Sequence, residues 1–174
     1  MILSDTELHA LCINNQLHDP YTPELVNPAS IDVRLGADIL VELKSNQGDM
    51  EKLSIASATA EAPWLLAPGE FILASTIERF NVPNYLAAQF KLKSSRAREG
   101  LEHLLAGYID PGFHNSALTL ELVNVRRHSC VPLWPGMKIG QVVYYQMSQV
   151  PNRDYATVGN YNNCPTVAAS KGHL

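Results

Sequence analysis

Apolar and polar residues alternate over much of this chain, which is the pattern of half-buried β-strands. Residues 31–35 carry apolar side chains at every second position, and residues 39–43 repeat the pattern after Gly36. Because successive strand side chains point to opposite faces, each segment predicts a strand with one face turned to a core. Shorter apolar runs follow, broken at Pro68-Gly69, Pro83, Pro111-Gly112 and Pro135-Gly136. These turn signals predict a mainly β fold of the sandwich or barrel type.

The first residues follow a helical period instead. Ser4 and Glu7 have the spacing of a capping box, and Leu8, Leu11 and Cys12 follow at helical intervals. A capping box ahead of such a stripe predicts an N-terminal helix.

The length and composition suit a single domain over residues 1–174. With 174 residues and 46% hydrophobic content, the chain can bury a sizeable core. Residues 44–51 are polar and predict a loop, and residues 150–174 form a polar, Asn-rich tail. Tails of this composition are usually loosely ordered; the functional alternative is an arm that closes over a bound ligand.

The charge balance and the cysteines narrow the function classes. The formal net charge is -4 and the basic residues form one small cluster, so a nucleic-acid surface is not expected. Nothing resembles a signal peptide or a membrane span, so we expect a cytoplasmic protein with no membrane partner. Cys12, Cys130 and Cys164 are far apart and odd in number, which fits reduced thiols rather than a disulfide framework.

A basic cluster stands out within this acidic chain. Four of the thirteen basic residues fall within eight positions: Lys91, Lys93, Arg96 and Arg98. Ser94 and Ser95 begin a helix-compatible stretch that Gly100 can end. Hydroxyl groups, free backbone N–H groups and guanidinium groups together make a phosphate site, and a short helix facing water is an equally good interpretation of this segment alone.

A single acid, Glu121, lies in a strand of otherwise uncharged residues. Alternation places Leu118, Leu120 and Leu122 on one face and Glu121, with Thr119, on the other. A lone Glu on a strand is more often solvated than catalytic. In a partly dry pocket beside a guanidinium, which Arg98 is placed to supply, it would suit proton transfer.

Several segments, in their order and spacing, resemble the dCTP deaminase family, which is related to the trimeric dUTPases. The segments are KSSRAREG (93–100), AGYIDPGF (106–113), LELVN (120–124), PASIDVRLG (28–36), LLAPGEFILASTIERFNVP (65–83), PLWPGMKIGQVVYY (132–145) and ASKG (169–172). The resemblance implies a distorted β-sandwich or jelly roll of the dUTPase-like β-clip type, with one short internal helix. It also implies a homotrimer with sites at subunit interfaces and a C-terminal arm, residues 150–174, that folds over the nucleotide.

The resemblance assigns roles to individual residues. Glu121 would be the proton donor and acceptor, Arg98 would hold it and the attacking water, and Ser94 would hydrogen-bond the water or the intermediate. The substrate-binding residues it implies are Lys93, Ser95, Arg96, Ala106, Asp110, Phe113, Thr119, Leu120, Tyr155, Tyr161 and Lys171.

Some of these positions have an ordinary structural interpretation as well. Asp110 precedes a Pro-Gly turn and suits a turn hydrogen bond as well as a ligand role, which the resemblance gives as deoxyribose recognition. Phe113 is by default a core aromatic, although the family places an aromatic against the sugar. His103 is interpreted as structural or surface, and Asp32 and Arg34 as a strand-edge salt bridge or subunit contact.

Zinc is not expected. Most nucleobase deaminases use an H-x-E segment and a later P-C-x-x-C to bind zinc, and neither occurs here. The six histidines show no ligand spacing. The expected metal is Mg²⁺ carried in with the triphosphate, with no dedicated protein ligands.

The chain also departs from the family pattern. Lys93 stands where Arg is normal, which replaces a bidentate phosphate contact by a point charge. The stretch between Arg98 and Ala106 is one residue short, with Leu105 where Thr is usual. In the tail, Asn160 and Cys164 stand where Lys and Gln are common, so triphosphate and base contacts are weakened or transferred to Lys171.

The leading functional hypothesis is hydrolysis of dCTP to dUTP and ammonia in pyrimidine deoxynucleotide supply, with dTTP and dUTP as further ligands of the same site. One alternative is a bifunctional enzyme that also hydrolyses dUTP, or a dUTPase alone, although dUTPases of this fold lack the strand glutamate. A second alternative is a non-catalytic nucleotide-binding relative.

Overall fold

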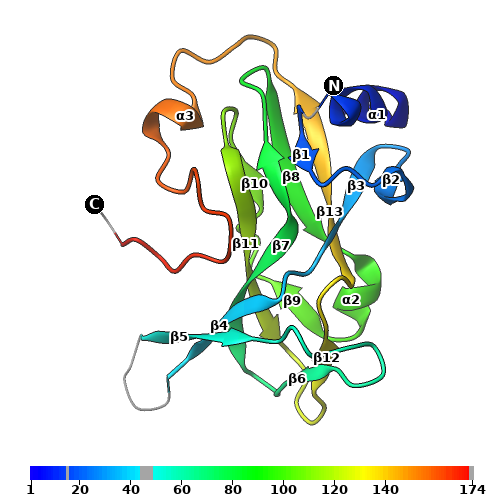
Figure 1. The fold of residues 1–174 in the computed structure, drawn as a ribbon, viewed down its shortest axis with the longest axis vertical. Helices are drawn as coiled ribbons and strands as arrows, with labels where there is room; N and C mark the ends of the chain where they lie inside the picture. Colours follow the sequence, from blue (N-terminus) through cyan, green and yellow to red (C-terminus); the bar gives the residue numbers. More distant parts are fainter. Residues whose placement is uncertain (15, 44–48, 173–174) are drawn as a thin grey trace.

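Antiparallel strands are the main regular secondary structure in a computed structural model, which describes residues 1–14, 16–43 and 49–172 (Figure 1). The strands of the largest sheet are β1 (His18–Asp19), β4 (Asp38–Glu42), β5 (Met50–Ser54), β7 (Phe71–Asn81), β9 (Leu101–His103) and β11 (His114–Asn124). Their order is β5-β4-β7-β11-β9, with β1 also paired to β7. The two long strands β7 and β11 therefore form the centre of this sheet.

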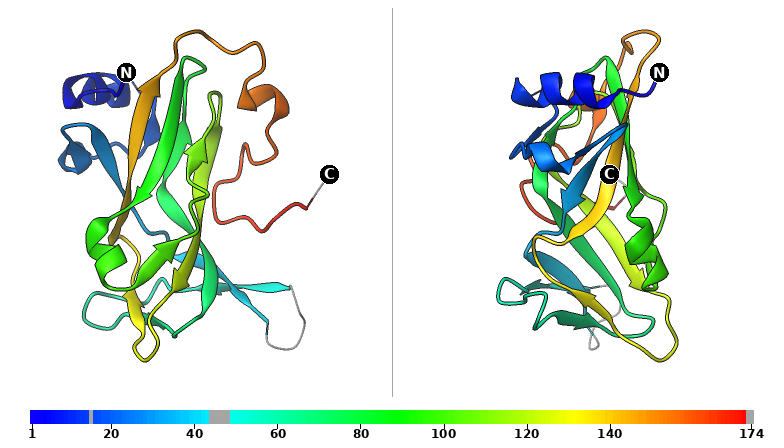
Figure 2. Two further views of the ribbon diagram at one scale, coloured as in Figure 1. Left: turned by 180° about the vertical axis from the view of Figure 1, so that it is seen from behind. Right: turned by 90° about the vertical axis from the view of Figure 1, so that its right-hand side faces the viewer.

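A second sheet of five strands packs on the first (Figure 2). Its strands are β2 (Val26–Asn27), β3 (Ser30–Arg34), β8 (Leu86–Leu92), β10 (Tyr108–Ile109) and β13 (Lys138–Gln146), in the order β10-β8-β13-β3-β2. A small sheet joins β6 (Trp64–Leu66) to β12 (Val131–Leu133). The predicted mainly β sandwich is confirmed.

The core lies between the two large sheets and follows the predicted alternation. Ile31 and Val33 on β3 are buried, as are Leu120 and Leu122 on β11 and Val142 on β13. Full burial of an aliphatic side chain of this size contributes about 1.5–3 kcal/mol to folding, so these alternating positions fix which face of each strand points inward.

The predicted N-terminal helix is α1 (Asp5–Ile13). The carboxylate of Glu7 accepts hydrogen bonds from Ser4 N at 2.8 Å and Ser4 Oγ at 2.9 Å, so the two capping-box residues meet as expected. Leu8 and Cys12 are the buried residues on the inner face of the helix. A short 3-10 turn, Pro23–Leu25, precedes β2.

The predicted internal helix is α2 (Ser94–Arg98), and Gly100 follows it with φ of 90°. A third helix, α3 (Tyr155–Val158), was not predicted. It has a single turn, too short for a hydrophobic period to reveal, and Asp154 caps it through a hydrogen bond from Thr157 N at 3.1 Å. The loop expected over residues 44–51 lies largely outside the described residues, and Met50 already belongs to β5.

The tail packs against the sandwich, contrary to the loose order that its composition alone predicts. Strand β9 pairs only with residues 122–124 of β11, so the rest of that edge needs other partners. Ala117 N donates to Cys164 O at 2.9 Å, and Ala168 N donates to Thr119 Oγ1 at 3.1 Å. Residues 150–172 therefore cover this edge, as the red and orange segment of Figure 1 shows. Residues 173–174 lie outside the described part of the arm.

No helix among the described residues has the length and apolar character needed to cross a membrane.

Candidate active site

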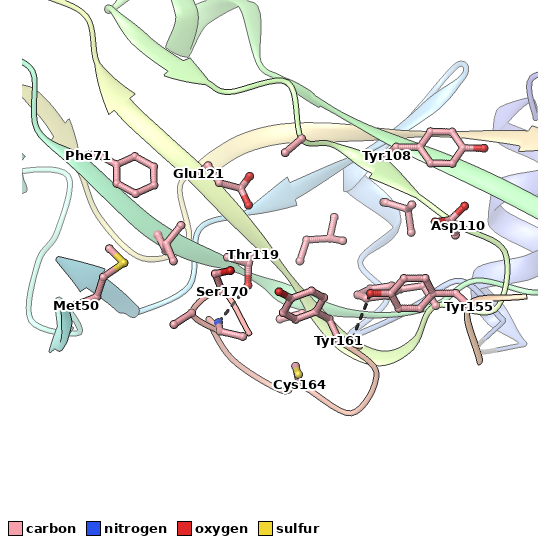
Figure 3. A pocket seen from close by; sticks show the side chains of 18 of the residues that line it. Met50, Phe71, Tyr108, Asp110, Thr119, Glu121, Tyr155, Tyr161, Cys164 and Ser170 are labelled. Atoms are coloured by element: carbon pink, nitrogen blue, oxygen red, sulfur yellow. Dashed lines mark hydrogen bonds between the residues drawn. The ribbon is translucent and has the colours of Figure 1, made fainter. Parts of the chain in front are cut away.

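A cavity of about 760 Å³ opens between the first sheet and the tail (Figure 3). Its floor comes from β7 and β11, one end from the start of β5, and the other from β10 and the turn that follows it. The tail forms the outer wall. The cavity therefore exists only because segments far apart in the sequence meet along β11.

Glu121 lies on the floor of this cavity, in largely apolar surroundings. It faces Leu73 directly across the β11–β7 pair, and Phe71 and Met50 line the same end of the cavity (Figure 3). Its side chain is 28% exposed, and the Oε2 atom is shielded from solvent without a hydrogen-bond partner among the described residues. His103 Nε2 is 3.4 Å from that oxygen. The carboxylate is thus partly desolvated.

The far end of the cavity is aromatic. The rings of Phe113 and Tyr155 meet edge to face with centroids 5.5 Å apart. The Tyr155 hydroxyl accepts a hydrogen bond from Tyr161 N at 3.2 Å. Burial is the main cause that raises the pKa of Tyr155 above its usual value, so this phenol stays neutral. Asp110 lies at the same end in Figure 3.

The arm is tied to the cavity wall by polar contacts. Cys164 N donates to Ser116 Oγ at 3.1 Å, and Ser116 Oγ donates to Tyr161 O at 2.9 Å. Lys171 Nζ lies 5.1 Å from the centre of the Tyr161 ring and donates to Asn160 O. These contacts place Tyr161 and Cys164 in the lining of the cavity.

Helix α2 does not line this cavity. It lies across the sandwich from the tail, on the far side of β8, in both face-on views (Figures 1 and 2). Ser94, Ser95 and Arg98 are exposed there, and Arg98 has no ion-pair partner among the described residues. The predicted catalytic set is therefore split within one chain, with Glu121 in the cavity and the other two residues on an outer surface.

Two of the predicted phosphate ligands are held by partners within the chain. Lys93 Nζ lies 2.7 Å from Asp32 Oδ1, and Arg96 forms an ion pair of 2.7 Å with Glu99 and stacks over Trp134. Burial raises the pKa of Asp32, but hydrogen bonds from Lys93 and from other donors lower it by more, so the net shift is downward. Lys93 and Arg96 are therefore each paired with a carboxylate of their own chain.

Comparison with known proteins agrees with the fold. The model of the dCTP deaminase-like family matches residues 2–147. The chain belongs to this family. A protein of Bifidobacterium adolescentis named "dCTP deaminase, dUMP-forming" is 42% identical, over 92% of this chain and 88% of that protein. A Corynebacterium efficiens protein of the same name is 38% identical, over 100% of this chain and 95% of that protein.

A solved structure shows that the family fold is shared. The crystal structure of 2'-deoxycytidine 5'-triphosphate deaminase from Agrobacterium tumefaciens aligns with a TM-score of 0.65 at 20% identity. The alignment covers 82% of this chain and 47% of that one. At 20% identity this likeness shows that the two chains share a fold.

Half of the residues that the resemblance to this family implied meet in the cavity. Those that line it are Ala106, Asp110, Phe113, Thr119, Glu121, Tyr155 and Tyr161. Leu120 is an exception, because its side chain is buried in the core. Leu118, predicted to share a face with Leu120 and Leu122, lines the cavity and also packs against the core. The β7–β11 register shifts between Ala117 and Thr119, and this irregularity breaks the strict alternation.

His103 was not among the predicted site residues. Interpreted as structural or surface, it is buried and its Nε2 atom faces the Glu121 carboxylate. No sequence signal marks it, because a histidine in a three-residue strand carries no pattern of its own. The expected salt bridges of Asp32 and Arg34 are confirmed, the latter to Glu78 at 2.7 Å.

Among residues 1–14, 16–43 and 49–172, no three His, Cys, Asp or Glu side chains are grouped as metal ligands.

Proposed function

We propose that this chain is a dCTP deaminase that releases dUMP. In the first step dCTP and water give dUTP and ammonia, and in the second dUTP and water give dUMP and diphosphate. The proposal is supported by relatives that are 42% and 38% identical over nearly their whole length and are named dUMP-forming. It revises the expectation that dUTP is the final product.

Glu121 supplies the acid–base chemistry of the first step in this proposal. The carboxylate takes a proton from the water that attacks C4 of cytosine and then delivers protons to N3 and to the departing amine. Its position on the cavity floor, half shielded and opposite Leu73, supports this role. The apolar surroundings exclude bulk water that would otherwise compete for the protons.

The aromatic end of the cavity receives the sugar in this proposal. Phe113 and Tyr155 present a rigid apolar wall, and Asp110 at the same end offers a carboxylate to a sugar hydroxyl. A 2'-hydroxyl pressed against an aromatic ring would lose its hydrogen bonds to water, which favours deoxyribose over ribose.

Helix α2 of a second subunit completes the site in this proposal, as part of a homotrimer. Ser94 and Arg98 are exposed on a surface remote from the cavity of their own chain. In a cyclic trimer that surface meets the cavity of the next subunit, where Arg98 can hold Glu121 and Ser94 can bind the water. Mg²⁺ would arrive with the triphosphate and keep mostly phosphate and water ligands.

A test of subunit sharing is to mix two inactive variants, Glu121→Gln and Arg98→Ala, after reversible dissociation. Random 1:1 trimers keep both native groups in about one quarter of the composite sites, so the mixture should regain about that share of ammonia release. A mixture as inactive as its components would contradict shared sites. Size measurement of the wild-type protein in solution gives the subunit number independently.

A deaminase that stops at dUTP is the second candidate, because the chain departs from the family pattern beside Ala106 of the cavity lining. Leu105 replaces the usual Thr in a shortened stretch, has φ of 62° and is 90% exposed, outside the cavity lining. Product identification by chromatography separates the candidates. Incubation with dCTP should yield ammonia, dUMP and diphosphate in equal amounts, whereas dUTP that accumulates without diphosphate would select the second candidate. Bound dCTP with no product would favour the non-catalytic alternative.

A further inference from the structure

We infer that His103 is a positioning residue for Glu121, whose ring N–H at Nε2 holds Oε2 of that carboxylate and leaves the other oxygen to face the substrate. The inference rests on the proposed function of Glu121. Strand β9 pairs with β11 so that His103 is the register partner of Leu122, next to the glutamate. This pairing brings β9 alongside the segment of β11 that carries Glu121.

The two atoms that face each other have no other partner. His103 Nε2 and Glu121 Oε2 are 3.4 Å apart, both are shielded from solvent, and neither has a hydrogen bond within the described part of the chain. A buried polar atom without a partner is costly, and an N–H···O bond is normally 2.7–3.2 Å long. If the distance between Nε2 and Oε2 shortened by a few tenths of an ångström, one hydrogen bond would satisfy both atoms.

The His103 ring is buried and packs against the ring of Phe90. Its side chain is 5% exposed, and its ring lies 4.7 Å from the Phe90 ring, centroid to centroid, at an angle of 57°. The backbone carbonyl of His103 accepts a hydrogen bond from Leu105 N at 2.6 Å. A ring packed in this way presents Nε2 in one direction, which is what a positioning residue needs.

His103 acts through Glu121 and not on the nucleotide. It does not line the large cavity, but it borders a second cavity of about 20 Å³ that Ala106 and Thr119 also line. That volume is about the space of one water molecule. The histidine thus reaches the carboxylate from outside the large cavity and borders a space too small for any part of a nucleotide base.

A donated N–H favours the ionised carboxylate, which is the form that accepts the proton of the attacking water. Loss of this donor should move the acidic limb of the pH–rate profile to higher pH. Other titratable groups of the cavity come from β5, β10, the following turn and the tail, and they are Asp49, Tyr108, Asp110, Tyr155, Tyr161 and Cys164. They remain unchanged in the variants below, so they contribute equally to every profile.

The test compares His103→Leu, which has no donor, with His103→Gln, whose amide Nε2 can replace the ring N–H. For ammonia release from dCTP, the acidic limb of kcat/KM should rise by about one pH unit in His103→Leu and stay near the wild-type position in His103→Gln. Glu102→Gln, an exposed neighbour on β9, is the matched control and should leave the profile unchanged. An unshifted limb in His103→Leu, with or without a uniform loss of rate, would overturn the inference, as would equal shifts in both variants.

A second measurement needs neither turnover nor a folded Leu variant. In the ¹⁵N-histidine-labelled wild-type protein, with His103 assigned from the spectrum of His103→Gln, the ring proton should reside on Nε2 at neutral pH. A proton found only on Nδ1 would contradict the inference. This measurement does not depend on dCTP. A proton on Nδ1 would therefore refute the inference while the proposed function holds. Absence of dCTP turnover would refute the proposed function and leave the NMR result unchanged.

Discussion

Glu121 on β11 lies directly opposite Leu73 on β7, so the carboxylate of the cavity is set against an aliphatic side chain. The pair explains how a charged residue on a strand comes to be half shielded. Leu73→Ala would remove this apolar neighbour and admit water beside the carboxylate.

For Leu73→Ala we expect a loss of about 2 kcal/mol in the free energy of unfolding, at the lower end of the range for a buried leucine because the side chain borders a cavity. Urea denaturation measures it. The kcat for deamination should fall as well, since a wetter carboxylate transfers protons less effectively. A variant with wild-type kcat would show that the apolar neighbour does not matter for catalysis.

His18 gives the fold a dependence on pH. The residue is 1% exposed, and burial, followed by repulsion from Arg34, lowers its pKa from 6.5 to about 4. The unfolded chain therefore binds a proton that the native protein does not, so stability is fully present above pH 6.5 and is lost as the pH falls from 6.5 toward 4. The loss should reach about 3 kcal/mol over that window.

Chemical denaturation of the wild type and of His18→Leu, at a series of pH values, checks this linkage. The variant should have the flatter dependence between pH 6.5 and pH 4. His128→Gln, which changes an exposed histidine, should keep the wild-type slope. Parallel slopes for wild type and His18→Leu would assign the dependence to other groups.

Asp32 is expected to be essential for stability rather than for phosphate binding. Its carboxylate accepts hydrogen bonds from Lys93 at 2.7 Å and Asn27 at 2.9 Å, and Lys138 Nζ lies 3.1 Å away. Asp32→Ala leaves these donors facing a buried space, which should cost about 3 kcal/mol. Thermal unfolding measures it. If the unfolding temperature is unchanged, the ion pair with Lys93 does not hold that side chain in solution.

Gly112 and Gly69 form a matched pair for testing the arm. Both have positive φ, of 86° and 74°, so alanine at either position is strained by about 1 kcal/mol. A Cβ at Gly112 would also lie 3.0 Å from Ala156 N in α3, whereas a Cβ at Gly69 meets nothing within 4 Å. Gly112→Ala should therefore raise KM for dCTP several-fold and speed proteolysis of the arm, and Gly69→Ala should do neither. Equal behaviour of the two variants would contradict a role for this contact.

The alternation of apolar residues predicts the sandwich because each strand is half buried and its period is local. The capping box at Ser4 and the turns at the Pro-Gly pairs are local signals too, and the structure has them where expected. The pairing of Lys93 with Asp32 joins residues that are far apart in sequence, and no periodicity reports such a contact.

The site was predictable only in part for the same reason. Glu121 is on the predicted face of its strand, but its shielding depends on Leu73 and on the position of β9, which are set by sheet order. The order of strands in a sheet is a long-range property, so His103 could not be placed from the sequence. The tail forms a cavity wall because it bonds along the part of β11 that β9 does not pair with. Which part of β11 is left unpaired depends on the assembled sheet, so the sequence does not predict it.

The most direct test of the central claim compares ammonia release from dCTP by the wild type and by Glu121→Gln, with dCTP binding measured by calorimetry on the same samples. We predict that the variant binds dCTP within about tenfold of the wild-type Kd and releases ammonia at least about 100-fold more slowly, the size expected for loss of a general acid–base group. Ammonia release by Glu121→Gln within a few-fold of the wild-type rate would contradict the assignment of this carboxylate as the proton carrier.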